Sequence, residues 1–203
     1  YRDMGEYEKA LPLYQRALDI REKVLGPEDP GVARILNNLA LLYYQMGDYK
    51  QALPLYQKAL YIREKVLGPK HPDIAQTLNN LAGLYEDLGA YEQALLLYQK
   101  VFDIEVELLG PKNPSVAITL NNLALLYKNV GDYDKALLLY QRSLDIREKA
   151  LGPKHPGVAR TLNNLAGLYK SKGEYEKAFP LYQRALEIVE KMLGQKHLET
   201  VTI

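Results

Sequence analysis

Paired asparagines are the side chains whose repetition most suggests chemistry in this sequence. The block Leu-Asn-Asn-Leu-Ala begins at Leu36, Leu78, Leu120 and Leu162, at a constant spacing of 42 residues. An asparagine amide carries both hydrogen-bond donors and an acceptor. A row of such amides therefore suits the N–H and C=O groups of an extended peptide backbone, and points to recognition rather than to covalent chemistry.

Side chains that could catalyse a reaction or bind a metal do not converge. His71 and His155 occupy equivalent positions two repeats apart, and His197 lies one repeat further on. Packed helices are about 8–10 Å apart, which separates these histidines far more than the roughly 2 Å ligand distance of a zinc site allows. Acidic pairs such as Glu86-Asp87 are expected to be surface charge at helix ends. With no phosphate loop, nucleophile elbow or Ser/His/Asp set, we predict no enzyme activity, no metal and no cofactor.

The elements that must position the asparagines are pairs of antiparallel helices. Four apolar residues at i, i+3, i+4 and i+7 mark one face of a first helix: Leu78, Leu81, Ala82 and Tyr85. Gly89 can end that helix in the left-handed conformation, and the second helix runs from about residue 90 to the Gly110-Pro111 stop. At 100° per residue, Asn80 points about 150° and Asn79 about 110° away from the apolar face. We therefore expect neither asparagine of a pair to lie in the core.

The starts of the first helices carry recognisable signals. Pro72, Pro114 and Pro156 fit a first turn, where proline lacks only a donor that would be unpaired anyway. Asp29 and Asn113 are good N-caps, while His71 and His155 are expected to be poorer ones.

The repeat extends over the whole chain, which predicts a solenoid rather than one globular core. We divide residues 1–203 into a single array: 1–26 as the end of a first helix plus a second helix, full repeats at 27–68, 69–110, 111–152 and 153–194, and 195–203 as the start of a further repeat. Both ends cut into repeat units, so the chain is expected to be part of a longer array.

The pattern Tyr-x-x-x-Gly-x-Tyr-x-x-Ala, as in Tyr85 to Ala94, resembles the tetratricopeptide repeat (TPR). The usual period of that family is about 34 residues. The longer period here, together with Leu-Asn-Asn-Leu-Ala and Ile-Arg-Glu-Lys-Val-Leu-Gly, resembles the repeats of kinesin light chains and of bacterial proteins built from the same unit. The resemblance implies an all-α fold, a right-handed superhelical solenoid of antiparallel helix pairs. The coiled coil that would join a kinesin heavy chain is absent, so a motor role does not follow.

The resemblance also implies a binding site. In TPR stacks the first helices line a concave groove, and in the kinesin light chain family the second asparagine of the block holds peptide ligands. Carried over by position, the peptide-binding candidates are Asn38, Asn80, Asn122 and Asn164, with Asn37, Asn79, Asn121 and Asn163 beside them. The alternative is that the amides bond neighbouring helices or water and recur only by duplication.

Positions that differ between repeats should set specificity. The first such position lies four residues before the second asparagine and holds Arg34, Gln76, Ile118 and Arg160. The second lies three residues after it and holds Leu41, Gly83, Leu125 and Gly167. The third lies near the helix end and holds Tyr44, Glu86, Lys128 and Lys170. Family members often carry lysine or arginine at the first of these sets for acidic ligands. Gln76 and Ile118 depart from that pattern, which weakens an acidic preference in the middle of the groove. The alternation of leucine with glycine suggests apolar bumps separated by notches that receive a large side chain.

The amino-acid composition limits the classes of binding partner. The net charge is +1, with 26 basic and 25 acidic residues. The chain therefore lacks the excess of positive charge that would attract nucleic acids or anionic membranes, and we predict neither as a partner. No cysteine is present, which excludes disulfides and favours a cytoplasmic location. We predict a scaffold that binds an extended peptide or partner-protein segment. The alternative is a structural spacer, or an array that associates end to end through its truncated ends, with function in flanking domains.

Overall fold

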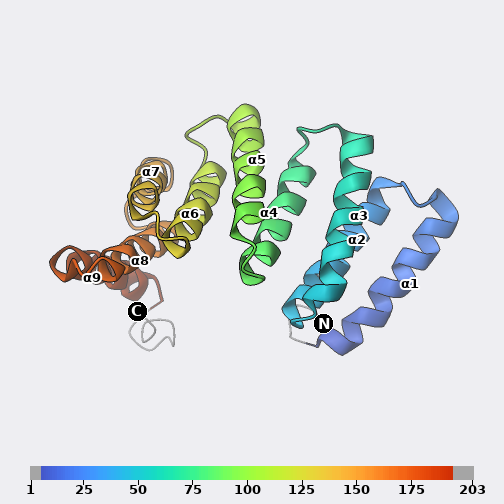
Figure 1. Ribbon diagram of the computed structural model, residues 1–203, viewed down its shortest axis with the longest axis horizontal. Coiled ribbons are helices and arrows are strands. Elements are labelled where there is room, and N and C mark those ends of the chain that lie inside the picture. The colour runs from blue at the N-terminus through green and yellow to red at the C-terminus, as the bar shows by residue number, and fades with distance from the viewer. Residues whose placement is uncertain (1–5, 194–203) are drawn as a thin grey trace. The chain divides into compact units, whose positions relative to one another are not determined.

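Helices and turns, with no strand, make up the part of the chain that the structure describes. The computed structural model describes residues 6–193, which contain nine helices and no strand (Figure 1). Four helices of 16 residues are the first helices: α2 (Pro30–Gln45), α4 (Pro72–Asp87), α6 (Pro114–Asn129) and α8 (Pro156–Ser171). Five helices of 19 residues are the second helices: α1 (Tyr7–Leu25), α3 (Tyr49–Leu67), α5 (Tyr91–Leu109), α7 (Tyr133–Leu151) and α9 (Tyr175–Leu193). The predicted all-α fold of helix pairs is confirmed.

Each first helix begins at a proline that follows a capping side chain. Asp29 and Asn113 accept hydrogen bonds from the backbone N–H groups two residues later, as predicted. The two histidines cap their helices in the same way. Nδ1 of His71 accepts from the Asp73 N–H at 3.1 Å, and Nδ1 of His155 accepts from the Gly157 N–H at 3.0 Å. Only a ring nitrogen without a proton can accept, so these caps require the Nε2–H form of the imidazole.

The turn inside each helix pair contains a left-handed glycine. After α4 ends at Asp87, Gly89 adopts a φ of +73° and the chain reverses into α5. An L-residue with a side chain rarely tolerates that conformation. The predicted break at this glycine is therefore confirmed.

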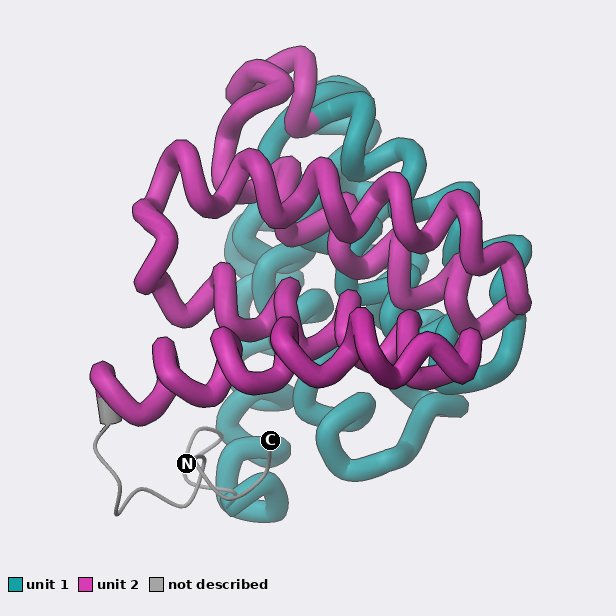
Figure 2. The backbone as a smooth tube through the Cα atoms, turned by 90° about the vertical axis from the view of Figure 1, so that its left-hand side faces the viewer, with its two compact units in different colours: residues 1–104 teal, residues 105–203 magenta. Residues whose placement is uncertain are grey.

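The chain divides into two compact units, residues 1–104 and 105–203, coloured separately in Figure 2. Unit 1 contains α1 to α4 and most of α5, and within it α2 contacts both α3 and α4. Unit 2 contains the end of α5 and α6 to α9, and within it α6 contacts both α7 and α8. In each unit, two first helices thus lie against each other.

Small and aliphatic side chains form the core of each unit. In unit 1, Ala82 of α4 and Ala94 of α5 are fully buried. Ile74 and Leu78 of α4 pack against Val101 of α5. Unit 2 repeats the arrangement, with Val158 and Leu162 of α8 in one cluster with Ala185 and Ile188 of α9.

The described helices fall inside the repeats at 27–68, 69–110, 111–152 and 153–194, and α1 lies in 1–26. The expected start of a further repeat at 195–203 lies outside the described residues. That these repeats form one single array, and that its ends associate, remain predictions.

Candidate functional site

One solvent-facing stripe runs along each first helix. On α4 it consists of Gln76, Asn80, Gly83 and Asp87, which are exposed or half-buried, whereas Leu78 and Leu81 on the other side are buried. We call this row and its counterparts the amide stripe: Arg34, Asn38, Leu41 and Gln45 on α2, Ile118, Asn122, Leu125 and Asn129 on α6, and Arg160, Asn164, Gly167 and Ser171 on α8. The predicted specificity positions therefore reach solvent on every first helix.

The asparagines of neighbouring first helices bond to each other in both units. Nδ2 of Asn80 donates to Oδ1 of Asn37 at 3.3 Å in unit 1, and Nδ2 of Asn164 donates to Oδ1 of Asn121 at 3.2 Å in unit 2. The bond gives the Oδ1 atom of each buried asparagine, Asn37 or Asn121, a hydrogen-bond donor, as buried polar atoms require. It also fixes the orientation of the two second asparagines.

The expectation that no asparagine of a pair lies in the core is wrong for two of the eight. Asn37 is 2% exposed and Asn121 is 5% exposed. A helical wheel treats one helix alone, whereas here α4 packs on α2 and α8 packs on α6 and covers that side. Asn79 is half-buried and Asn163 is exposed.

The second asparagines keep accessible surface. Asn38, Asn80, Asn122 and Asn164 are all half-buried. An amide has two N–H donors and an oxygen acceptor, and the bond from Asn80 to Asn37 uses one donor only. The Asn80 oxygen is not engaged in that bond, so the group can serve a ligand without breaking it.

Glycine and leucine alternate three residues after the second asparagine, with different consequences. A Cβ atom at Gly83 would meet only the Tyr98 hydroxyl, at 3.9 Å, so the helix surface is open there. Leu41 and Leu125 instead pack onto core clusters that contain Tyr56 and Tyr140 respectively. A glycine opening beside a packed leucine is thus present in unit 1, whereas in unit 2 the Nζ of Lys128 lies 3.5 Å from the Gly167 Cβ position.

The helix end of the stripe is acidic and tyrosine-rich in unit 1. The Tyr44 hydroxyl donates to Asp87 Oδ2 at 2.6 Å, and the Tyr49 hydroxyl donates to the same atom at 3.5 Å. The Glu86 carboxylate interacts with the Tyr98 hydroxyl, and burial, followed by the negative charge of Asp87, raises the pKa of Glu86. Sequence reasoning placed Glu86-Asp87 as surface charge and missed these tyrosine partners.

The same place in unit 2 is basic. Lys128 and Lys170 stand where unit 1 has Tyr44 and Glu86, and α6 and α8 contain no acidic residue. The Lys128 Nζ lies 3.5 Å from the position that a Cβ on Gly167 would occupy. The Ser171 hydroxyl turns back to the Gly167 carbonyl at 2.9 Å.

Two buried arginines lie between second and first helices. Arg63 of α3 donates to the Asp73 carbonyl and to the Thr77 hydroxyl oxygen, and Arg147 of α7 donates to the Gly157 carbonyl and to the Thr161 hydroxyl oxygen. Burial lowers the pKa of both guanidinium groups. At Arg63 the negative charge of Asp73 opposes this shift and the positive charge of Arg34 adds to it, whereas at Arg147 the positive charge of Arg160 adds to it. The recurrence of Arg and Thr fourteen residues apart, at an interval of 84, was the sequence signal that could have found them.

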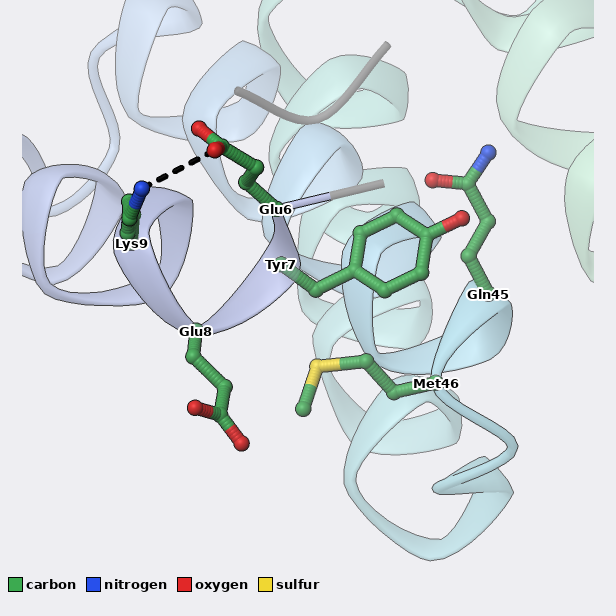
Figure 3. Close-up of a pocket in the computed structure, with 6 residues that line it drawn as sticks. All are labelled: Glu6, Tyr7, Glu8, Lys9, Gln45 and Met46. Atoms are coloured by element: carbon green, nitrogen blue, oxygen red, sulfur yellow. Dashed lines mark hydrogen bonds and ion pairs between the residues drawn. The ribbon is translucent and has the colours of Figure 1, made fainter. Parts of the chain in front are cut away.

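Two hollows of the surface lie mostly outside the amide stripes. In unit 1, a hollow of about 580 Å³ is lined by Glu6, Tyr7, Glu8, Lys9, Gln45 and Met46, and Lys9 and Glu6 form an ion pair of 2.9 Å (Figure 3). In unit 2, a hollow of about 500 Å³ is lined by the same Glu-Tyr-Glu-Lys sequence at 174–177 together with Gly173. Of the stripe residues, only Gln45 borders either of these hollows.

Among residues 6–193, no group of three or more His, Asp or Glu side chains is arranged to hold a metal ion. No helix in that range is long and apolar enough to cross a membrane.

Comparisons with known proteins agree with the architecture. The family model described as tetratricopeptide repeat matches residues 1–60, 32–105, 97–149 and 115–191. The crystal structure of BtubC (BKLC) from P. vanneervenii is 30% identical, with a TM-score of 0.83 over 96% of this chain and 78% of that one. A putative kinesin light chain with nearly identical TPR-like repeats from Podosopora anserina is 26% identical, with a TM-score of 0.81 over 97% and 92% of the two chains. No curated protein matches the chain.

Proposed function

Because this chain belongs to the tetratricopeptide-repeat family, we propose that it binds an extended segment of a partner protein along the amide stripes. Tetratricopeptide repeats generally mediate protein–protein interactions and generally act as non-enzymatic scaffolds. The finer proposal is that the backbone of the bound segment pairs with the second asparagines. One observation carries it: in both units, a buried asparagine holds the half-buried amide of its neighbour in a set orientation.

The two asparagines of a pair have different roles in this proposal. Asn80 and Asn164 reach solvent and would contact the bound backbone, as would Asn38 and Asn122 on the neighbouring helices. Asn37 and Asn121 have almost no accessible surface, so they act by positioning Asn80 and Asn164. Holding an amide in place before a ligand arrives lowers the entropic cost of binding.

The remaining stripe positions would select the side chains of the bound segment. Arg34, Gln76, Ile118 and Arg160 precede the second asparagines and are all exposed. The opening at Gly83 is suited to a side chain that points at the helix, whereas Leu41 and Leu125 present apolar contact. In an extended segment successive side chains alternate in direction, so such a surface would read every second residue.

The test is a selection from a random peptide library. We would compare the parent protein with an Asn80→Ala/Asn164→Ala variant, and use Gln141→Ala/Gln183→Ala as the matched control. The control glutamines are exposed on second helices, away from the stripes. We expect peptides that are enriched on the parent and on the control and lost on the asparagine variant.

Truncating Asn80 also removes the partner of the buried Asn37, so circular dichroism and thermal unfolding must accompany the selection. A second variant avoids that cost. Gly83→Leu leaves the amide bond intact and extends over an open surface, where a Cβ makes only an ordinary contact, so it should abolish binding without lowering thermal stability. Enrichment that is indifferent to both variants would refute the proposal and favour the spacer interpretation.

A further inference from the structure

The opening at Gly83 in unit 1 is a small, chemically distinctive place. Its floor is the Tyr98 hydroxyl, 3.9 Å from where a Cβ would be, and the Tyr98 side chain is only 4% exposed. One turn along α4, Glu86 interacts with that hydroxyl, and Asp87 follows it. A side chain that enters here meets an acceptor oxygen and two carboxylates.

Unit 2 shows what kind of group such an opening accommodates. Gly167 lies 84 residues after Gly83, and the Tyr182 hydroxyl stands 3.7 Å from its Cβ position, as the Tyr98 hydroxyl does at Gly83. There the opening already contains a cation, because the Nζ of Lys128 is 3.5 Å from the same position. An ammonium group at the end of a flexible chain therefore fits beside the glycine and the tyrosine.

Among the described residues of unit 1, no cation lies beside Gly83. The residue equivalent to Lys128 is Tyr44, and its hydroxyl is turned to Asp87 at 2.6 Å instead. Within residues 6–193, the Tyr98 hydroxyl is the one side-chain atom within 4 Å of the Gly83 Cβ position. The opening is thus accessible in the unit whose first helices carry Asp73, Glu86 and Asp87 against a single Arg34.

We propose that the opening at Gly83 receives a lysine or arginine side chain of the bound segment, with Glu86 and Tyr98 as its hydrogen-bond acceptors. The proposal rests on the function proposed above and assigns the side-chain chemistry of one position. A charged hydrogen bond to a carboxylate is roughly twice as strong as a neutral one. The rings of Tyr44 and Tyr98 add aromatic surface of the kind that cations favour.

The same reasoning predicts no such preference in unit 2. Lys128 occupies the opening there, and Lys170 stands in place of Glu86. A second cation would meet two like charges, which disfavours it. The two units would therefore read different side chains of a partner.

The chain supplies its own matched substitutions for the test. Glu86→Lys/Asp87→Ser introduces the residues that the same positions carry in α8, so the helix is known to accept them. The reciprocal variant, Lys128→Tyr/Lys170→Glu/Ser171→Asp, gives unit 2 the residues of unit 1. Both would be used in the random-peptide selection beside the parent and the Asn80→Ala/Asn164→Ala variant.

We expect asparagine-dependent peptides from the parent to carry lysine or arginine at one fixed position. Replacing that residue by norleucine in an enriched peptide should weaken binding to the parent about tenfold, the loss expected for a charge-assisted hydrogen bond. It should not weaken binding to Glu86→Lys/Asp87→Ser. The reciprocal variant should acquire a second cationic preference.

The outcomes separate the two proposals. Peptides that need the asparagines but show no cationic position, or keep it unchanged on Glu86→Lys/Asp87→Ser, would overturn this inference and leave peptide binding intact. If no enrichment depends on the asparagines, peptide binding itself fails, and the inference fails with it.

Discussion

Unit 1 and unit 2 contain equivalent helix pairs, and the same Asn–Asn bond, yet their first helices have opposite charge. The stripe end is Tyr44, Glu86 and Asp87 in unit 1, and Lys128 and Lys170 in unit 2. The core positions beneath stay small or aliphatic, with alanine at both Ala82 and Ala166 and an Ile74 to Val158 exchange beside them. Charge changes sign on the exposed side while the buried positions of these helices keep their apolar character, so packing and recognition occupy separate faces of the first helices.

A second contrast lies in the core. Arg63 has the Asp73 carboxylate 3.8 Å from its guanidinium, whereas Arg147 has Gly157 at the corresponding position and bonds only neutral oxygens among the described residues. A buried charge without a counter-charge is costly even when it is hydrogen-bonded. The stability of unit 2 should therefore depend more strongly on the two neutral oxygens that accept from Arg147 than the stability of unit 1 depends on those that accept from Arg63.

The largest effect is expected from removing one of those acceptors. Thr161→Val keeps the side-chain shape but deletes the hydroxyl oxygen that accepts from Arg147 at 2.8 Å. An unsatisfied buried charged donor costs about 2–3 kcal/mol. Thr77→Val makes the same change beside Arg63, where Asp73 partly compensates, and should cost about 1 kcal/mol less. Urea unfolding followed by circular dichroism would compare them, and equal losses would contradict the contrast between the two arginines.

Supplying the missing carboxylate should stabilise unit 2. Gly157→Asp reproduces Asp73, which coexists with the His71 cap in α4. The Cβ would lie 3.1 Å from the His155 imidazole and 3.5 Å from Arg147, so a small adjustment of the histidine is needed. A carboxylate in the first turn also interacts favourably with the helix dipole, and we expect about 1 kcal/mol more unfolding free energy than for Gly157→Asn. Thermal unfolding of the two variants isolates the charge, and no advantage of aspartate over asparagine would count against the prediction.

The stability of the two units should also depend differently on pH, because the position 42 residues before Arg63 and Arg147 differs between them. Unit 1 has Arg21, which bonds Asp29 at 2.7 Å, whereas unit 2 has Glu105, whose partner is the Thr119 hydroxyl at 2.7 Å. Burial raises the pKa of Glu105 above its ordinary value near 4.5. The folded state therefore holds that proton more tightly, so the stability from protonation is fully present below the ordinary pKa and is lost as pH rises through the raised pKa.

Glu105→Gln should remove that penalty, because the neutral amide can still accept from Thr119. We expect a higher melting temperature at pH 7 and no gain below about pH 4. The measurement is thermal unfolding of parent and variant across this range. A gain that is the same at every pH would show that Glu105 ionisation does not cost stability.

The smallest effect is expected where the units agree. His71→Asn and His155→Asn replace weak caps by a preferred one and should each add about 0.5 kcal/mol. Because both histidines make the same bond at nearly the same distance, the two gains should be equal within error in urea unfolding. Unequal gains would mean that differences between the units extend to the helix starts.

Much of the local structure was predictable from residue types. The prolines and caps at the start of the first helices, the left-handed Gly89 and the fourfold apolar face are local signals, and the helices begin and end where they indicate. The tetratricopeptide identity was confirmed by the family match. Peptide binding, its site residues, the repeat boundaries as one array and a cytoplasmic location stay predictions.

What could not be predicted depends on contacts between helices. A helical wheel of one helix predicts that both asparagines of a pair are exposed. Asn37 and Asn121 are buried because the next first helix packs over them. The hydroxyl of Tyr44 reaches Asp87 across 43 residues of sequence, a pairing that no local spacing announces. In the sequence, Arg63 and Arg147 were visible only as a recurring residue type. That they are buried and donate to a carbonyl and a threonine hydroxyl became clear from the neighbouring first helices.

The sequence by itself determined the helices, their caps and their turns, because these follow from interactions within a few residues, and its apolar spacing marked the buried face of each first helix. The tertiary structure alone decided which amide of each pair is buried and which stays available, and which tyrosine meets which carboxylate. It also decided that one glycine opening contains a lysine while its counterpart stays open. Those outcomes depend on how neighbouring helices pack, and equivalent residues met different neighbours in the two units.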